Sequence, residues 1–159
     1  MKVKEVMTRD VKACALTESL ADAAKAMWDY DCGILPVVKD GKTVVGLITD
    51  RDICMAAATK GRTPSSISLE EVMTGRVYST MPEDDVRRAL ETMQIQKVRR
   101  LPVVGPEGEL KGILSMNDIV LKAKESKAKK PSQLNYADVV TTYKAICEHP
   151  LPMAAAAGK

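Results

Sequence analysis

Residues 46–53 read Gly-Leu-Ile-Thr-Asp-Arg-Asp-Ile, and residues 112–119 read Gly-Ile-Leu-Ser-Met-Asn-Asp-Ile. The second stretch matches the first at an offset of 66 residues, and each joins an apolar run to a hydroxyl residue followed three positions later by Asp. That spacing is typical of a capping box, in which two side chains bind the free N–H groups at a helix start. Each stretch therefore predicts a strand that leads directly into a helix. The predicted capping pairs are Thr49 with Asp52 and Ser115 with Asp118.

The match extends over a duplicated unit. An ungapped comparison of residues 5–53 with 71–119 gives 14 identities in 49 positions. Self-similarity at a fixed offset indicates a repeat architecture. Two further motifs recur in the same register, namely Glu-Val-Met-Thr at 5–8 and 71–74, and Leu-Pro-Val-Val at 35–38 and 101–104.

Each copy shows the same succession of elements. Extended pieces are predicted at 11–14 and 77–80, followed by helices whose apolar residues recur at i, i+3, i+4 and i+7. Thr17 is the expected N-cap of the first helix, and Pro82 is expected at the start of the second. The apolar faces of these helices are Leu20, Ala23, Ala24 and Met27, and Val86, Ala89, Leu90 and Met93. Apolar, β-branched strands separated by a turn then lead into the last helix, with predicted strands at 34–38, 44–48, 101–104 and 110–114.

The order β-α-β-β-α fills about 49 residues in each copy, which is near the lower size limit for independent folding. We therefore expect an α/β (α+β) fold in which two repeats pack as a pseudo-twofold pair, followed by a C-terminal helix. The expected divisions are 1–61 for the first repeat, 62–122 for the second, and 123–159 for a basic linker, an amphipathic helix and a flexible tail.

The composition limits the function classes. Of 159 residues, 45% are hydrophobic and 28% are charged, and the net charge of +3 is too small to indicate a nucleic-acid or membrane partner. No apolar run reaches the ~20 residues that a membrane span needs. Only 3% of the residues are aromatic, which argues against nucleic-acid binding by base stacking. Because His149 is the single histidine, no Ser/His/Asp or Cys/His catalytic site can be assembled, and we expect neither an enzyme nor a metal site.

The cysteines and the N-terminus bear on the compartment. Cys14, Cys32, Cys54 and Cys147 lie far apart in the chain, without Cys-x-x-Cys spacing, and the charged first residues contain no secretory signal. We expect reduced thiols and a cytoplasmic protein.

The repeated motifs resemble the cystathionine-β-synthase (CBS) domain. Val-Met-Thr, Leu-Pro-Val-Val and Gly-Leu-Ile-Thr-Asp-Arg-Asp-Ile, with their counterparts in the second copy, are similar to a tandem CBS pair, or Bateman module, over roughly residues 1–122. The resemblance implies clefts between the repeats that bind an adenosine-containing ligand. AMP, ADP or ATP is the implied regulatory ligand, NAD and S-adenosylmethionine are further candidates, and no cofactor is required. It also implies a homodimer that acts in sensing or regulation on an unidentified protein target.

The helix starts suit such a ligand physically. A helix N-terminus presents free N–H groups and a partial positive charge to a phosphate, and an Asp there can accept hydrogen bonds from two ribose hydroxyls. From the spacing alone, a plain helix cap is the favoured role of Asp52 and Asp118, and the two roles are compatible. With the resemblance added, Asp52 and Asp118 are expected to contact ribose, and Thr49 and Ser115 ribose or phosphate.

In the CBS family each cleft joins the Asp-bearing helix of one repeat to the early strand and the pre-Leu-Pro segment of the other. For Val11, Ile34 and Val77, packing in the core is the competing role. The cleft at Asp118 is expected to use Thr8, Val11, Ala13, Gly33, Ile34 and Ser115. The cleft at Asp52 is expected to use Thr49, Arg51, Thr74, Val77, Ser79 and Arg100.

The copies differ in charge near these clefts. Arg51 is matched by Asn117 at the offset of 66, and Gly33-Ile34 is matched by Arg99-Arg100. Because guanidinium groups bind phosphate oxygens in a bidentate manner, Arg51, Arg99 and Arg100 are candidates for holding a phosphate chain. The alternative for Arg99 and Arg100 is a solvated pair at the rim. Bulky Arg100 in place of Ile34 predicts that the two clefts bind ligand unequally.

The tail differs from the repeats. Five lysines between 122 and 130 predict a solvated linker, with a nucleic-acid-binding arm as a minor alternative. A helix is predicted at 136–147, where it covers the CBS core or docks on a partner subunit. Asp138, Thr142 and Lys144 are placed off its apolar stripe, which consists of Tyr136, Val139, Val140, Tyr143, Ile146 and Cys147.

Residues 144–147, with Pro and Met-Ala beyond them, resemble the tail of actinobacterial hypoxia-response proteins built from a CBS pair. That resemblance raises the hypothesis that Cys14 and Cys147 form a disulfide or a close thiol contact. The alternative to a nucleotide-binding module is a ligand-independent dimeric interaction protein that acts through its C-terminal tail.

Overall fold

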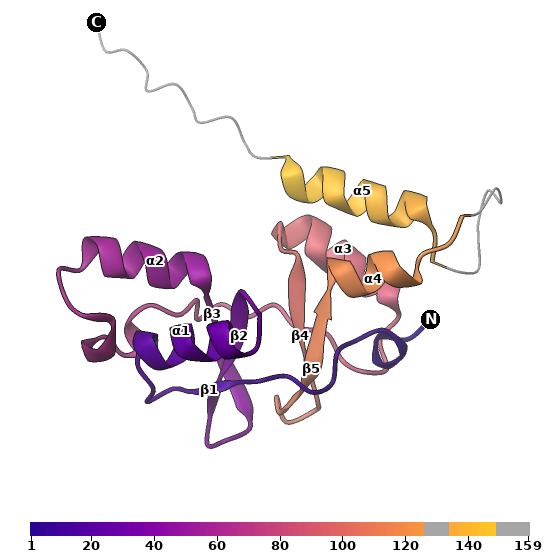
Figure 1. Ribbon diagram of the computed structural model, residues 1–159. Coiled ribbons are helices and arrows are strands. Elements are labelled where there is room, and N and C mark those ends of the chain that lie inside the picture. The colour runs from indigo at the N-terminus through magenta and orange to yellow at the C-terminus, as the bar shows by residue number, and fades with distance from the viewer. Residues whose placement is uncertain (126–133, 149–159) are drawn as a thin grey trace, which may run out of the picture.

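The computed structural model, which describes residues 1–125 and 134–148, has an α+β fold built from two similar units (Figure 1). The first unit contains β1 (Cys14–Ala15), α1 (Leu20–Asp29), β2 (Ile34–Lys39), β3 (Thr43–Thr49) and α2 (Asp50–Thr59). The second contains α3 (Val86–Gln96), β4 (Arg100–Val104), β5 (Leu110–Ser115) and α4 (Met116–Lys122). The remaining elements are the 3-10 turns η1 (Val3–Glu5), η2 (Pro64–Ser66) and η3 (Leu69–Glu71), and the C-terminal helix α5 (Tyr136–Cys147).

The two sheets repeat the same register. Ile34 of β2 lies opposite Thr49 of the antiparallel β3, and Arg100 of β4 lies opposite Ser115 of β5. In both hairpins the register shifts at the Val-Val step that closes the Leu-Pro-Val-Val motif. β1 adds a parallel strand to β2, whereas the second unit keeps only a parallel bridge at Thr80. The predicted hairpins are therefore confirmed, and the early strand is shorter than predicted in both units.

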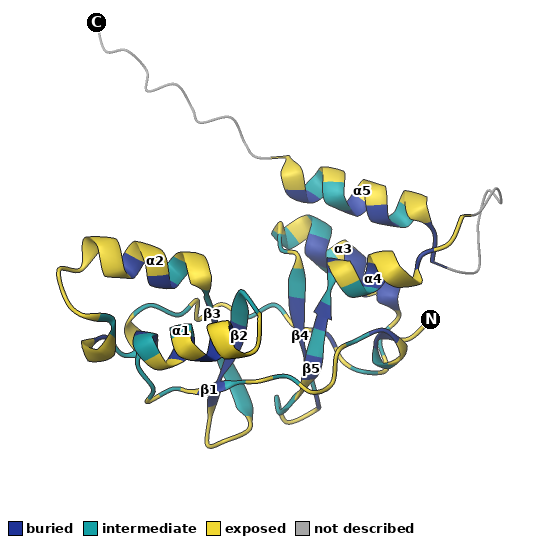
Figure 2. Ribbon diagram, in the orientation of Figure 1, coloured by how far each residue is buried: buried dark blue, intermediate teal, exposed yellow. Residues whose placement is uncertain are grey.

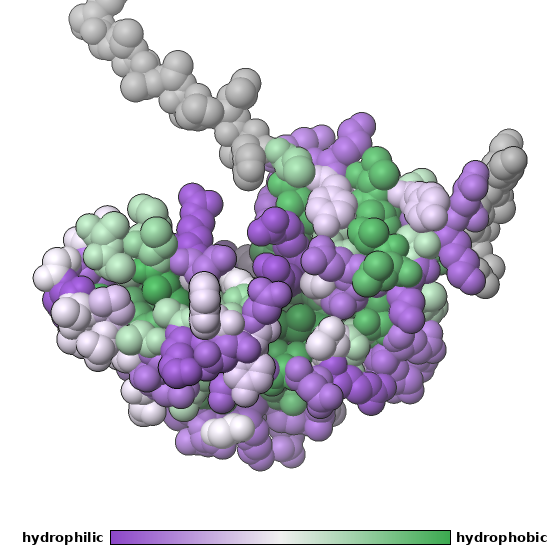
Figure 3. All heavy atoms as spheres, viewed as in Figure 1, coloured by the Kyte–Doolittle hydropathy of each residue, from purple (hydrophilic) through white to green (hydrophobic). Residues whose placement is uncertain are grey.

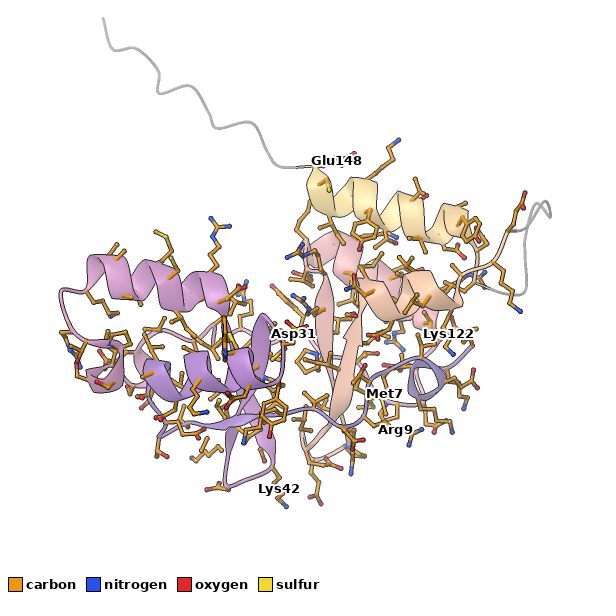
Figure 4. All side chains as sticks on the ribbon, in the orientation of Figure 1. Met7, Arg9, Asp31, Lys42, Lys122 and Glu148 are labelled. Atoms are coloured by element: carbon orange, nitrogen blue, oxygen red, sulfur yellow. The ribbon has the colours of Figure 1, made fainter. Side chains whose placement is uncertain are left out.

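The two units exchange their first segments. Thr8, which precedes the first unit, pairs with Ile113 of β5, and Thr74, which precedes the second, pairs with Leu47 of β3. Both pairs use two backbone hydrogen bonds of 2.9–3.2 Å. Figure 4 shows the side of the exchange that involves the N-terminus, where Met7 and Arg9 lie beside β5. Since each pair maps on the other at the 66-residue offset, the exchange follows the predicted pseudo-twofold symmetry.

The hydrophobic cores follow this exchange. Val3 of η1 is fully buried in the core of the second unit, with residues of α3, β4, β5 and α4. Ile67 and Leu69 complete the core of the first unit in the same way. Each core thus depends on a short segment from outside its own β-α-β-β-α succession, and burying such side chains contributes roughly 1.5–3 kcal/mol each.

Two of the four helix starts agree with the prediction and two differ. Thr49 and Ser115 are the N-caps of α2 and α4, each in a capping box, as predicted. Thr17 is not the cap of α1, because Ser19 accepts the N–H of the third helical residue. The second helix begins at Val86 with Asp85 as its N-cap, four residues beyond Pro82. In both cases an Asp or Ser placed closer to the apolar stripe takes the capping role.

Helix α5 covers the second unit, as predicted, by packing on α3 and α4 (Figure 2). Its buried face consists of Val139, Thr142 and Ile146, whereas Tyr136 and Val140 of the predicted stripe are each 56% exposed. Thr142 was expected off this face. Gln94 Nε2 donates a hydrogen bond to Thr142 Oγ1 at 2.8 Å, and Oγ1 donates one to the Asp138 carbonyl at 2.9 Å. Because both bonds satisfy the hydroxyl, Thr142 can be buried. Cys147, also in the predicted stripe, is exposed.

The structure contradicts the hypothesis of a Cys14–Cys147 bond. All four cysteines are free, with Cys14 buried in the core of the first unit and Cys147 exposed at the end of α5, which packs on the second. Burial, and next the nearby Glu18 carboxylate, raise the pKa of Cys14 to about 12. Lys127, Lys129, Lys130 and His149 lie outside the described residues, as does the predicted tail. No helix in the described ranges is long and apolar enough to cross a membrane.

Candidate ligand-binding clefts

The carboxylate of Asp118 joins the two units. Its Oδ2 accepts hydrogen bonds from Ser115 N at 2.8 Å and from Ser115 Oγ at 2.6 Å, which form the capping box of α4. Its Oδ1 accepts a further bond of 3.2 Å from Thr8 Oγ1, which comes from the exchanged N-terminal segment. The cap and the crossing segment therefore meet at one side chain.

Asp52 has the corresponding place in the other half. Its Oδ2 accepts hydrogen bonds from Thr49 N at 3.0 Å and from Thr49 Oγ1 at 2.7 Å. Within the described ranges, no hydroxyl donates to its Oδ1, so Thr74 does not make the contact that Thr8 makes with Asp118.

A cavity of about 400 Å³, here called the Asp118 cleft, lies between the first unit and the start of α4. Its walls come from the exchanged N-terminal segment, the end of α1, the start of β2 and the α4 cap. Of the seven residues expected there, Ala13 does not line it, and the other six do: Thr8, Val11, Gly33, Ile34, Ser115 and Asp118.

A second cavity of about 270 Å³, here called the Thr49 cleft, occupies the pseudo-symmetric position. Thr49, Thr74 and Arg100 line it, as expected, and so does Arg99, which was a candidate for holding a phosphate chain. Arg51, Val77 and Ser79 do not line it, and neither does Asp52, which lies behind Thr49 and is hydrogen-bonded to its hydroxyl.

Two of the predicted residues that miss the Thr49 cleft lie next to a lining residue in the chain. Tyr78 lines this cleft, whereas its neighbours Val77 and Ser79 do not. Arg51 is exposed on the first turn of α2 and does not join Arg99 and Arg100.

Both clefts contain charged residues that were not predicted from the sequence. Asp10, Lys12 and Asp31 line the Asp118 cleft, and Arg76 lines the Thr49 cleft. Asp31 follows α1 on the side that faces β4 (Figure 4). The offset of 66 relates Asp10 to Arg76, so testing every charged residue near Thr8 and Thr74 for its counterpart could have identified this pair.

The clefts also differ in how their charges are paired. Lys12 Nζ lies 5.9 Å from the centre of the Tyr30 ring, at the mouth of the Asp118 cleft. In the part of the chain that the structure describes, no acceptor binds the guanidinium of Arg76, Arg99 or Arg100. Arg100 and Ile34, which are repeat counterparts, line both clefts and form their shared wall.

A third and larger cavity, of about 500 Å³, lies between α1 and α2 and was not predicted. Met27, Trp28, Ile53 and Cys54 are among its lining residues, and Trp28 is 88% exposed. In Figure 3 hydrophobic side chains also gather over α4 and α5 on the same side of the molecule. The exposed apolar residues there are Val120, Leu121, Tyr136 and Val140.

Comparisons with known proteins agree with this architecture. The family model described as "CBS domain" matches residues 3–59 and 69–125. Protein YlbB of Bacillus subtilis is 33% identical over 121 residues, which are 76% of this chain and 80% of that protein. Hypoxic response protein 1 of Mycobacterium tuberculosis is 30% identical over 116 residues, which are 73% of this chain and 80% of the relative.

Two solved structures show the same fold. A crystal structure of hypoxic response protein 1 with two coordinated zinc ions matches with a TM-score of 0.71 and 27% identity, over 78% of this chain and all of the other. The CBS domain pair of protein MJ0100, in complex with 5′-methylthioadenosine and S-adenosyl-L-methionine, matches with a TM-score of 0.67 and 26% identity, over 76% of this chain and 94% of the other. With two copies of the family motif, exchanged first segments and a cleft at each Asp-bearing helix, the chain belongs to the CBS domain family.

Proposed function

We propose that this chain is a regulatory module that binds an adenosine-containing nucleotide between its two CBS repeats. The observation that carries the proposal is the Asp118 cleft, where a carboxylate and the hydroxyls of Thr8 and Ser115 converge at a cavity of about 400 Å³. Cavities of roughly 300–1,000 Å³ with a few convergent polar groups are typical of small-ligand sites. The MJ0100 domain pair, which has this fold, is solved with two adenosine compounds.

The residues of the cleft can perform distinct parts of the recognition. Asp118 accepts hydrogen bonds from vicinal ribose hydroxyls when Thr8 Oγ1 releases its Oδ1. Val11 and Ile34 supply apolar contacts for the base. The role that we propose for this cleft is ligand sensing.

Calorimetry with AMP, ADP, ATP, NAD and S-adenosylmethionine tests this proposal. We expect Asp118→Asn to weaken binding by about tenfold or more, because a hydrogen bond to a charged group contributes roughly 1.5–3 kcal/mol. Asp22→Asn is a matched control: Asp22 forms the same kind of capping box with Ser19 at α1 and lines neither cleft. If no compound binds, or if both variants lose affinity equally, the proposal fails.

We further propose that the protein is a homodimer in which the α1–α2 faces of two copies meet. Trp28 and Met55 expose 88% and 55% of their surface on this face, beside the cavity of about 500 Å³. A twofold interface uses the same patch on both subunits, so an exposed Trp beside a cavity can fill the partner's cavity. Light scattering should report a dimer for the wild type and a monomer for Trp28→Lys.

The alternative, a ligand-independent interaction protein that acts through its tail, is tested by truncation. Because Val139 and Ile146 of α5 belong to the core of the second repeat, the deletion should begin after Glu148. If this truncated chain still binds nucleotides and stays dimeric, the tail is not the functional part for either property.

A further inference from the structure

The Thr49 cleft holds positive charge without a partner. Arg76, Arg99 and Arg100 line it, and no acidic side chain does. Among residues 1–125 and 134–148, none of these guanidinium groups makes a hydrogen bond or an ion pair through its side chain. Arg62 and Arg87, by contrast, are paired with Glu71 and Asp138.

None of the three equivalent positions in the Asp118 cleft carries a positive charge. At the offset of 66, Arg76 corresponds to Asp10, Arg99 to Gly33 and Arg100 to Ile34. Asp31 and Asp118 add two further carboxylates to this cleft, against Lys12 and the shared Arg100. The duplication thus gives two cavities of the same construction with different charges.

Three arginines line one small cavity, and their like charges repel one another. An anion with several charges relieves this repulsion. Guanidinium groups bind phosphate oxygens in pairs, and a cleft lined by one sign of charge attracts the opposite ion. At about 270 Å³ the cavity suits the nucleoside part, while the exposed Arg76 and Arg99 at its edge reach a phosphate chain in solvent.

We infer that the two clefts take different ligands: the Thr49 cleft takes adenosine di- or triphosphate through Arg76 and Arg99, and the Asp118 cleft takes adenosine compounds with at most one phosphate. This division rests on the proposed function, because it assumes an adenosine ligand in both clefts.

The repeat supplies the variants that test the division. Arg76→Asp installs the residue that the other repeat has at the equivalent position, and Asp10→Arg is the reciprocal change. Since the Arg76 side chain is exposed and makes no hydrogen bond or ion pair with the described residues, its replacement removes no structural contact of that kind. Calorimetric titrations with adenosine, AMP, ADP, ATP and inorganic tripolyphosphate at two salt concentrations give the readout.

In the wild type we expect two binding events, with ATP tighter than AMP at one of them and weakened by salt. Arg76→Asp should reduce the affinity for ATP and tripolyphosphate at least tenfold and leave adenosine binding unchanged. Asp10→Arg should raise the affinity of the Asp118 cleft for ATP. The inference is overturned if ATP and adenosine bind with equal affinity, or if Arg76→Asp leaves the ATP affinity unchanged.

The two failures can be told apart. If adenosine, AMP, ADP and ATP do not bind at all, the proposed function fails. In that case tripolyphosphate decides the role of the Thr49 cleft. If it binds to the wild type and not to Arg76→Asp, the Thr49 cleft is a polyanion site that does not recognise adenosine. A melting temperature of Arg76→Asp equal to that of the wild type confirms that the fold is intact.

Discussion

The two repeats have the same helical face but differ in what lies on it. In the second repeat, α5 packs on α3 and α4, and Ile119 is fully buried. In the first repeat, the three-residue turn η2 contacts α1 and α2, Ile53 is 9% exposed, and a cavity of about 500 Å³ remains between the two helices. A symmetric duplication has thus become asymmetric through one helix added after it. The covered face is fixed as part of a core, and the uncovered face stays accessible to another molecule.

The largest effect is expected from truncating the paired isoleucines that lie under these faces. Ile119→Ala should lower the free energy of unfolding by about 2–5 kcal/mol, because α5 prevents the site from collapsing or hydrating. Ile53→Ala should cost less, since Ile53 lines an open cavity. Urea unfolding of both variants measures the difference. Equal losses would show that α5 does not tighten the second core.

Next in size is a pH effect confined to the first repeat. Its buried Cys14 corresponds to Thr80, which has no group that titrates in this range. The pKa of Cys14 is raised from 9.0 to about 12, so its contribution is fully present below about pH 9 and is lost as the pH rises toward 12. The loss is at most about 1.4 kcal/mol per pH unit.

Urea unfolding at pH 8 and pH 10, with reductant present, compares the wild type with Cys14→Ala. The variant should lose less stability between these pH values. Cys54→Ala is the control, because Cys54 is exposed and its removal should leave the pH dependence of the wild type unchanged. A Cys14→Ala protein as sensitive to alkaline pH as the wild type would contradict the prediction.

The smallest effect concerns the N-terminal segment where it crosses to the second repeat. Hydrogen bonds from Lys2 Nζ and Lys4 Nζ, at 2.5 and 2.6 Å, lower the pKa of Glu83 to about 2. A lowered pKa stabilises the fold above pH 4.5, and this contribution is lost as the pH falls toward 2. The counterpart of Glu83 in the first repeat is Thr17, so the other crossing lacks this pair of contacts.

Because the Glu83 side chain is 59% exposed, Glu83→Gln should shift the urea midpoint only slightly. Hydrogen exchange is the sharper measurement, since the Val3 N–H that bonds to the Asp84 carbonyl should exchange faster in the variant. Asp29→Asn, which removes an ion pair within α1, should leave Val3 unchanged. Unchanged exchange in Glu83→Gln would show that the ion pairs do not hold the crossing.

The sequence predicts features that local patterns determine. The helix caps at Thr49 and Ser115 follow from hydroxyl–carboxylate spacing, and both hairpins follow from β-branched runs around a turn. The range of α5 follows from its apolar period, but the burial of Thr142 does not, because it depends on Gln94 from another helix. The internal repeat does not show that Val3 completes the core of the second repeat. The 66-residue offset would be the same whether the segment that contains Val3 packed on the first repeat or on the second.

The sequence predicts the candidate clefts only in part, because local motifs are visible in it and tertiary contacts are not. The motif residues Thr8, Ser115 and Asp118 meet as the family resemblance implies. Ala13, Val77 and Ser79 fall outside the cavities because the direction of a side chain on an extended segment depends on the tertiary crossing. Arg76 and Asp10 lie outside the motifs and were not identified, although they carry the difference in charge.

The exchange of first segments also sets an order for folding during synthesis. Residues 1–8 are made before every other described residue, yet their partners are Asp84, Asp85 and Ile113. The first core needs only Ile67 and Leu69, which follow its own strands and helices directly. It can therefore close once the chain has passed Thr74, while the N-terminal segment remains unpaired until β5 has been synthesised. The earliest-made residues complete the latest-formed core, so damage at the N-terminus is expected to unfold the C-terminal repeat first.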